Sequence, residues 1–461
     1  MNWLHLALIA ALAVPGAALT PEQRALCAKG VRHEKAGWIY LHVEGGPRAR
    51  GFQHGYLLAP EIAGGLKAVR RCWEHQTGTT WESLLAKSAT FFVPGVDAEN
   101  LQELAGMAEG LAAAGVATTR DELVAYNGST ELSGYWWPQE LNRLKNEALP
   151  HQVKESCSAF IAIGSYTKDG GLVMGHNNMS GYQDPQPNVV IDLVPDQGHR
   201  ILMQGVPGWI HSGTDFFVTD AGLVGTETTI GDFQPYEQGG VPEFARMRRA
   251  TQDAGDLDAW CALMRKGNNG GYANAWLLGD LNRKEIARLE LGLKYVGFER
   301  KGDGFFTGSN IAEDPRILRL ETTSKDTDIN ASKIARRMRW RQLMAANKGR
   351  IDAELAKAFE ADHRDVARHE ERPGGRSLCG HFELEADAMW DTPFEPAGTT
   401  DAKVLDAAMA RRMAFAARFG TACGLPFDAE AFLKEHPQFD WLQGILPSRP
   451  TQPWVTFTAG E

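Results

Sequence analysis

The chain has 461 residues, of which 43% are hydrophobic and 23% charged, and its formal net charge is −10. This composition is that of a globular protein, and the length suffices for one large domain or two or three average ones. Because the acidic balance provides no basic field to displace counterions, a dedicated nucleic-acid-binding function is excluded.

The first twenty residues, MNWLHLALIAALAVPGAALT, hold an apolar core from Leu6 to Val14. This core is too short to span a bilayer as a helix, and small residues after it suit cleavage near Ala18. We expect residues 1–18 to be a signal peptide, although the segment before the core has no Lys or Arg. The chain is then secreted or periplasmic; a buried helix is the alternative.

The predicted elements change in kind along the chain. Residues 50–150 show apolar residues at helical spacing, with Asp97 suited to cap one helix. From Ser156 onward, strands are predicted in 156–163 and 172–177, joined by a turn around Lys168–Gly171, and then in 188–195, 200–209, 215–230, 274–280 and 286–293. Helical spacing is predicted in 242–252, 256–266, 332–347 and 404–420.

A run of antiparallel-type strands flanked by helices predicts an α+β fold, with helices packed on a two-sheet core. The charged segment 138–156 lacks apolar periodicity. It is predicted to be an exposed, mobile loop where chain cleavage is plausible. A boundary between two domains is the alternative interpretation of this segment.

Cys157 opens the first predicted strand, directly after that loop. It can be a buried packing residue, half of a disulfide or a nucleophile. The predicted hairpin returns His176 and Asn178 to the same strand edge. If the chain breaks before Cys157, its new α-amino group, with a pKa of about 7.7–8.0, can act as general base for its own thiol.

Several segments resemble the N-terminal nucleophile (Ntn) hydrolases of the acyl-coenzyme A:6-aminopenicillanic-acid acyltransferase type, which are peptidase C45-like, and especially phospholipase B-like proteins. These segments are RARGFQHGYLLAPEI, LVAYNGSTEL, SCSAF…GHNNMSGY, DFFVTDAGLVGTETTIG and TGSNIAEDPRI. The resemblance extends over most of the chain and implies a four-layer αββα sandwich with a helical N-terminal segment. It also implies autocatalytic cleavage between Ser156 and Cys157, giving chains 19–156 and 157–461 that stay associated non-covalently.

The resemblance also implies roles for individual residues. Asn310 would stabilise an oxyanion, and His176 or Asn178 would orient the nucleophile in place of the Arg and Asp of many relatives. The implied substrate-pocket residues are Thr228, Thr229, Arg336 and Arg337. Each has a structural alternative: a strand-end histidine, asparagines in turns, threonines that favour strands, and a solvated basic helix face.

The implied function is an autoprocessed amidohydrolase or acyltransferase that cleaves a C–N amide bond of an acylated amine or peptide through a Cys157 thioester. One alternative is a phospholipase B-like hydrolase of lipid acyl esters, with a membrane lipid as a conceivable substrate. A second alternative is a non-catalytic secreted binding protein. The chemistry needs no cofactor, and none is expected.

The six cysteines show no CxxC spacing, and with Cys157 free they form at most two disulfides. Cys379 and His381 stand two residues apart and could ligate a metal from one strand face. The sequence offers no second ligand pair at a matching spacing. No metal site is therefore expected.

Overall fold

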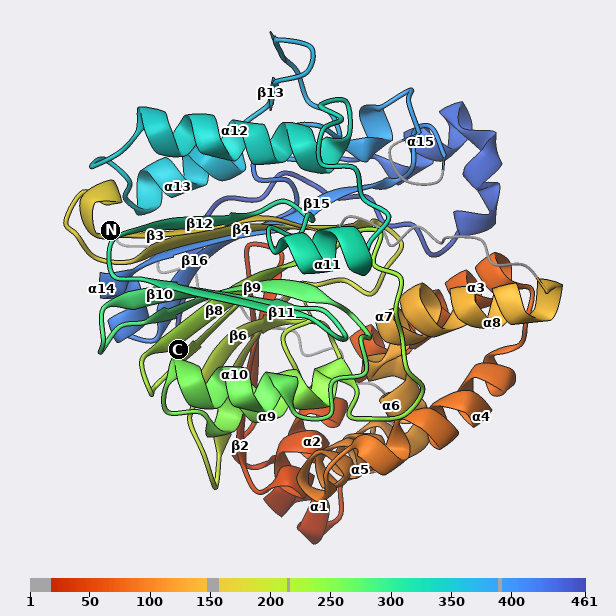
Figure 1. Ribbon diagram of the computed structural model, residues 1–461. Coiled ribbons are helices and arrows are strands. Elements are labelled where there is room, and N and C mark those ends of the chain that lie inside the picture. Colours follow the sequence, from red (N-terminus) through yellow and green to blue (C-terminus); the bar gives the residue numbers. More distant parts are fainter. Residues whose placement is uncertain (1–17, 147–156, 214–215, 389–391) are drawn as a thin grey trace, which may run out of the picture.

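The computed structural model describes residues 18–146, 157–213, 216–388 and 392–461 (Figure 1). The predicted signal peptide, apart from Ala18, and Ser156 of the predicted processing site lie outside the described residues. Cys157, on the other side of that site, is described.

The N-terminal part contains a β-hairpin and then a set of helices. Their bounds are α1 (Pro21–Cys27), β1 (Val31–Lys35), β2 (Trp38–Gly45), α2 (Pro47–Leu57), α3 (Ala59–Thr77), α4 (Trp81–Phe91), η1 (Val93–Gly95), α5 (Ala98–Ala113), α6 (Arg120–Asn127), α7 (Ser129–Glu131), η2 (Leu132–Trp136) and α8 (Trp137–Lys145). The predicted cap is confirmed, since the Asp97 carboxylate accepts from the backbone N–H groups of Glu99 and Asn100. In the described part of the chain, the helices all lack the combined length and apolarity needed to cross a bilayer.

The prediction of an exposed loop over 138–156 was wrong for its first part, which forms helix α8. Trp137, the first residue of α8, packs edge-on against Trp73 with ring centroids 5.4 Å apart. On the solvent side, Glu140 and Arg143 form an ion pair one turn apart. These contacts stabilise a helix that the charged sequence did not indicate.

The strands form two large sheets. The first has nine strands in the order β1-β2-β5-β6-β7-β8-β9-β10-β11, and the second has six in the order β12-β3-β4-β15-β16-β17. The strands after β2 are β3 (Cys157–Ile163), β4 (Val173–Gly181), β5 (Val189–Pro195), β6 (Ile201–Gly205), β7 (Phe216–Thr219), β8 (Leu223–Thr229), β9 (Asn274–Asp280), β10 (Glu285–Leu291), β11 (Val296–Lys301), β12 (Gly304–Gly308), β13 (Arg364–Asp365), β14 (Glu370–Glu371), β15 (Ala397–Asp406), β16 (Ala414–Phe419) and β17 (Val455–Thr458). Pairing is antiparallel except between β2 and β5, which run parallel.

The remaining helical elements lie between and after these strands. They are η3 (Gly164–Tyr166), α9 (Glu243–Asp253), α10 (Leu257–Arg265), α11 (Pro315–Leu320), α12 (Ser332–Ala346), α13 (Ala353–Glu360), η4 (Phe382–Leu384), α14 (Ala407–Arg411), α15 (Ala429–Glu435) and η5 (Pro437–Leu442).

The two sheets pack face to face, with helices on their outer faces (Figure 1). One buried cluster joins Tyr40 and Val190 of the nine-stranded sheet to Ile161 and Phe415 of the six-stranded sheet. Helices α12 and α13 cover the outer face of the six-stranded sheet, where Trp340 packs on β3. The predicted mixture of large sheets and packed helices is confirmed. That this sandwich is the one of the Ntn hydrolases stays a prediction.

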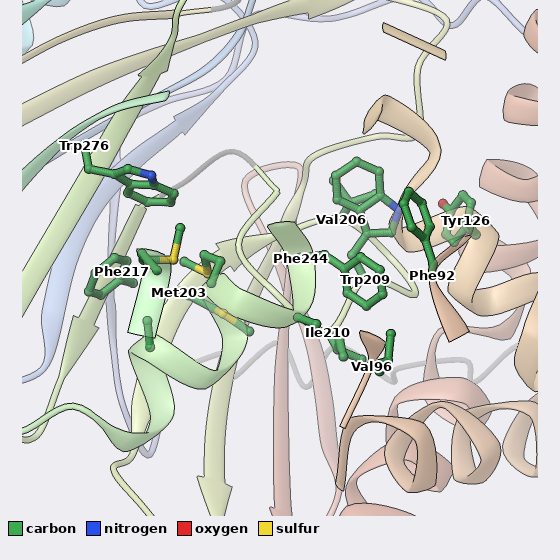
Figure 2. Packing of buried hydrophobic residues seen from close by; sticks show 14 of the residues in the cluster. Phe92, Val96, Tyr126, Met203, Val206, Trp209, Ile210, Phe217, Phe244 and Trp276 are labelled. Carbon is green, nitrogen blue, oxygen red and sulfur yellow. The ribbon is translucent and has the colours of Figure 1, made fainter. Parts of the chain in front are cut away.

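The N-terminal helices pack against the nine-stranded sheet through a large buried cluster that includes aromatic residues (Figure 2). Trp209, after β6, meets Tyr126 of α6 edge-on, with ring centroids 6.1 Å apart. The Tyr126 hydroxyl donates to the carbonyl of Pro207 at 3.1 Å. These contacts hold the N-terminal segment next to the strand ends where Cys157 lies.

The prediction of one helix over 404–420 was wrong. The segment contains the end of β15, the short helix α14 and then β16. Its alanines favour a helix, but Phe415 and Ala417 lie in the core between the sheets. Burial in the sheet thus overrides local propensity.

Candidate active site

The predicted hairpin of β3 and β4 is confirmed, and its register places Cys157 opposite Asn178. Cys157 is fully buried at the first position of β3. Its sulfur lies 3.9 Å from the Asn178 side-chain oxygen and 3.9 Å from a carboxylate oxygen of Glu227 on β8. The thiol therefore faces polar groups from both sheets.

Asn310 follows β12 and contacts the backbone nitrogen of Cys157. The Cys157 N–H donates to Asn310 Oδ1 at 3.4 Å, and Asn310 Nδ2 donates to the carbonyl of Thr229 at 2.9 Å. Asn310 has a φ of 67°, a left-handed conformation that asparagine tolerates better than most residues. In this orientation the amide oxygen holds the nitrogen of Cys157, and the amide N–H groups face Thr229.

Of the two predicted arginines on α12, Arg336 reaches this site and Arg337 does not. Arg336 is fully buried; its Nη1 donates to the Cys157 carbonyl at 2.7 Å and its Nη2 to Asn310 Oδ1 at 2.9 Å. Arg337 donates instead to the carbonyl of Asp326 at 3.1 Å and lies 3.7 Å from Glu313. One guanidinium thus fixes both the nucleophile candidate and its asparagine neighbour.

Asn178 belongs to a buried polar network on β15. Its Nδ2 donates to Thr400 Oγ1 at 2.7 Å and to Asp401 Oδ2 at 3.2 Å. Asp401 forms an ion pair with Lys403, and both side chains are fully buried. This network holds the Asn178 amide with its oxygen toward the Cys157 sulfur.

His176 lies on β4 opposite Ala159, two residue positions along the strands from the Cys157–Asn178 pair. Burial and the nearby Lys403 ammonium lower the pKa of His176 well below its ordinary value, so the imidazole is neutral. The ring packs between the sheets near Phe216, with centroids 6.5 Å apart. Among the contacts of the described residues, none joins the His176 ring to Cys157, so the orienting role of His176 stays a prediction.

Glu227 is a further site residue that was not expected from the sequence. Its buried carboxylate accepts from the Tyr272 hydroxyl at 3.2 Å. With its amide oriented to satisfy its neighbours, Asn274 also donates to Glu227 at 2.9 Å. A charged residue inside the apolar strand LVGTETTI was the available signal, because strands of this kind bury charge only where partners exist.

A cavity of about 320 Å³ adjoins this site. Asn178, Thr229 and Tyr272 lie on its wall at the Cys157 end. The N-terminal helical segment also lines the cavity, with residues that include Trp73 and Gly134. The cavity is lined by both apolar and polar side chains, the usual character of a small-molecule site.

The two predicted pocket threonines on β8 differ in position. Thr229 borders the cavity and accepts from Asn310 through its carbonyl. Thr228 packs against β12, where a Cβ added at Gly308 would lie 2.5 Å from its methyl group. Thr229 is thus a pocket residue in this structure, and Thr228 fixes the contact between the two sheets.

Comparison with known proteins gives one family model and several relatives that match part of the chain. The family model described as Phospholipase B matches residues 98–297. Rat and human proteins named "Putative phospholipase B-like 2" are each 31% identical, over 155 and 169 residues, which are 30% and 32% of this chain. An uncharacterized protein of Archaeoglobus fulgidus is 26% identical over 304 residues, 62% of this chain and 49% of its own length.

The matched part covers 26% of the rat protein and 28% of the human protein. The chain thus spans only about a quarter of the length of these curated relatives. Across this central region the chain is similar to phospholipase B-like proteins, and that similarity is the part of the sequence resemblance that the comparisons support.

Proposed function

We propose that the protein is an acyl hydrolase with Cys157 as its nucleophile, matured by cleavage of its own chain before Cys157. The observation that carries the proposal is the arrangement at the first residue of β3. There a buried thiol, a backbone nitrogen bound by Asn310 and a carbonyl bound by Arg336 meet beside a cavity. The packing of two sheets between helices supports the Ntn-hydrolase form of this proposal.

Maturation in this proposal is cleavage of an amide bond. The Cys157 sulfur attacks the carbonyl carbon of Ser156, and the C–N bond to Cys157 breaks as its nitrogen takes up a proton. Water then hydrolyses the resulting thioester between Ser156 and the Cys157 sulfur. This step releases a carboxylate on Ser156 and the free Cys157 thiol. The new amino group keeps Asn310 Oδ1 as its hydrogen-bond acceptor.

Turnover uses the same two groups. The amino group takes the proton of the thiol, the sulfur attacks a substrate acyl carbon, and the leaving group departs with that proton. Water then resolves the acyl thioester. To stabilise an oxyanion, Asn310 would have to turn its Nδ2 from the Thr229 carbonyl toward the substrate acyl group. In its present orientation, Asn310 Oδ1 accepts from the Cys157 nitrogen, which suits the role of orienting the amino group that acts as base.

A lipid acyl ester is the first substrate candidate. The named relatives are called phospholipase B-like, which supports this choice over the amide substrate that the sequence analysis favoured. A cavity of about 320 Å³ with Trp73, Trp209 and Leu84 on its wall provides apolar surface for an acyl chain.

An acylated amine or peptide is the second candidate. Its support is the chain's own amide bond before Cys157, which is the first substrate of the proposed nucleophile. Thioester chemistry handles both bonds, so the pocket decides between them.

The experiment is a substrate panel with matched acyl chains, comparing lysophospholipids with N-acyl amines. The protein and its Cys157→Ala variant are assayed side by side. Cys157-dependent release of fatty acid from the lysophospholipids is the expected result. Release only from the N-acyl amines would reverse the order of the candidates, and equal release by Cys157→Ala would overturn the nucleophile assignment.

A further inference from the structure

Four potential metal ligands come together on the outer side of the six-stranded sheet. They are His363 after α13, Cys379 and His381 before η4, and Cys423 after β16. One ligand atom from each lies within 4.8 Å of all the others. No partners for Cys379 and His381 were evident in the sequence, because His363 and Cys423 are brought in from distant segments.

We infer that this cluster is a structural zinc site. Two thiolates and two imidazoles form the Cys₂His₂ set that Zn²⁺ prefers in closed tetrahedral sites. The Cys423 sulfur lies 3.6 Å from His381 Nε2. Bond lengths of about 2.3 Å to sulfur and 2.0–2.1 Å to nitrogen at a tetrahedral angle require an S···N separation of about 3.6 Å. The ligand atoms that lie farther apart would reach tetrahedral distances by movements on the order of 1 Å.

The surrounding groups orient the imidazoles toward a common centre. His381 Nδ1 lies 3.1 Å from a carboxylate oxygen of Glu383, so Nδ1 carries the proton and Nε2 presents its lone pair to the cluster. His363 Nε2 is buried, and the His363 side chain interacts with the Cys423 thiol inside the cluster. The two rings stand at 70° to each other with centroids 5.3 Å apart, so they do not stack.

The Cys423 sulfur also accepts a backbone hydrogen bond. The backbone N–H of Leu425 donates to the Cys423 sulfur at 3.3 Å, as N–H groups do at many thiolate ligands. Cys379 is fully buried and not disulfide-bonded. Between Cys379 and His381, Gly380 has a φ of 56°, and a Cβ there would lie 2.7 Å from Met179. Glycine at this position allows the turn that brings both flanking ligands to one side.

The four ligands belong to segments that pack against strand β4. Asn177 of β4 donates through Nδ2 to the carbonyls of Glu360 at 2.7 Å and Leu378 at 2.8 Å. Glu360 stands three residues before His363, and Leu378 directly precedes Cys379. Asn178, the next residue, lies beside the Cys157 thiol. Zinc in this position would stabilise the segments that hold β4, the strand that carries Asn178. It would not contact the proposed acyl hydrolase site.

The test is the metal content of protein purified without a histidine tag, measured by plasma mass spectrometry. We expect about one zinc per chain, and in chelator-treated protein a lower melting temperature that added Zn²⁺ restores. Co²⁺ added to the zinc-free protein should give the intense near-ultraviolet thiolate–cobalt absorption band. Because these measurements use the unaltered chain, they hold even if variants fail to fold.

Two variants and a control sharpen the test. Cys423→Ser should remove the cobalt band and most of the zinc, and Glu383→Gln should weaken zinc affinity by roughly 10–100-fold. Cys261→Ser, at a buried cysteine of α10 outside the cluster, should leave zinc content unchanged. A Cys379–Cys423 disulfide in peptide mapping, or zinc-free protein that takes up neither Zn²⁺ nor Co²⁺, would overturn the inference.

Discussion

Arg336 binds the carbonyl oxygen of Cys157 at 2.7 Å with one nitrogen and the side-chain oxygen of Asn310 at 2.9 Å with another. A single fully buried guanidinium from α12 therefore fixes the end of β3 relative to the turn after β12. Lysine offers a point charge without this fork, so it cannot make both bonds in the same geometry.

We expect Arg336→Lys to slow both chain cleavage and substrate hydrolysis by about 100-fold, the range found for the loss of one preorganised donor. Arg337→Lys is the matched control, because the neighbouring arginine contacts Asp326 and Glu313 instead. Cleavage is followed by gel and hydrolysis by fatty-acid release. Unchanged rates for Arg336→Lys would remove this arginine from the site.

Gly134 lies on the cavity wall, and a Cβ added there meets no atom within 4 Å. Gly134→Phe should fill the cavity while leaving Cys157 and its contacts intact. We expect KM for the substrate to rise on the order of tenfold or more, with chain cleavage at its normal rate. Gly64→Phe is the control, since Gly64 is exposed on α3, away from the cavity, and equally open. Equal KM values for the two variants would show that substrate does not use this cavity.

The Asp401–Lys403 ion pair is fully buried. Lys403→Met leaves the Asp401 charge without its cation and should lower the free energy of unfolding by about 3–5 kcal/mol. Lys357→Met is the comparison, because its partner Glu354 is largely exposed and such surface pairs contribute about 0–1 kcal/mol. Urea unfolding of both variants measures the difference, and similar losses would contradict the assigned burial.

His54 on α2 is buried and accepts from the backbone N–H of Gly208 at 2.9 Å through Nε2. Burial lowers the pKa of His54 from 6.5 to about 4. Between these pH values the unfolded chain binds a proton that the folded chain does not. The free energy of unfolding therefore falls as pH drops through this window, and the loss is complete below the folded pKa.

His54 alone should account for about 2 kcal/mol of the loss in unfolding free energy between pH 7 and pH 5. In His54→Gln, the amide oxygen can accept from Gly208 but does not titrate, so the variant should lose about 2 kcal/mol less than the parent chain. The exposed His369, replaced by Asn, serves as the control. Identical pH dependence in parent and His54→Gln would show that His54 takes up its proton in the folded state as well.

The β3–β4 hairpin could be predicted because its apolar strands and glycine-containing turn are adjacent in the sequence. Asn310 and Arg336 were reached through resemblance to a family, and the structure places both on Cys157. Glu227 was missed because its contact with Cys157 joins two different sheets, and local pattern carries no information about that packing. Segment 404–420 was misassigned because helix propensity of its alanines is weaker than burial in the sheet.

The proposed zinc ligands could not be assembled from the sequence for the same reason. Cys379 and His381 were recognised as a possible ligand pair, but His363 and Cys423 come from segments after α13 and β16. Only the fold brings these segments together.

Intact mass spectrometry of the purified protein can show whether Cys157 becomes the first residue of a separate chain. We expect two species from the parent chain, one of them beginning at Cys157, and a single uncut species from Cys157→Ala. A parent chain that stays uncut between residues 156 and 157, while hydrolysing its substrate, would contradict this expectation.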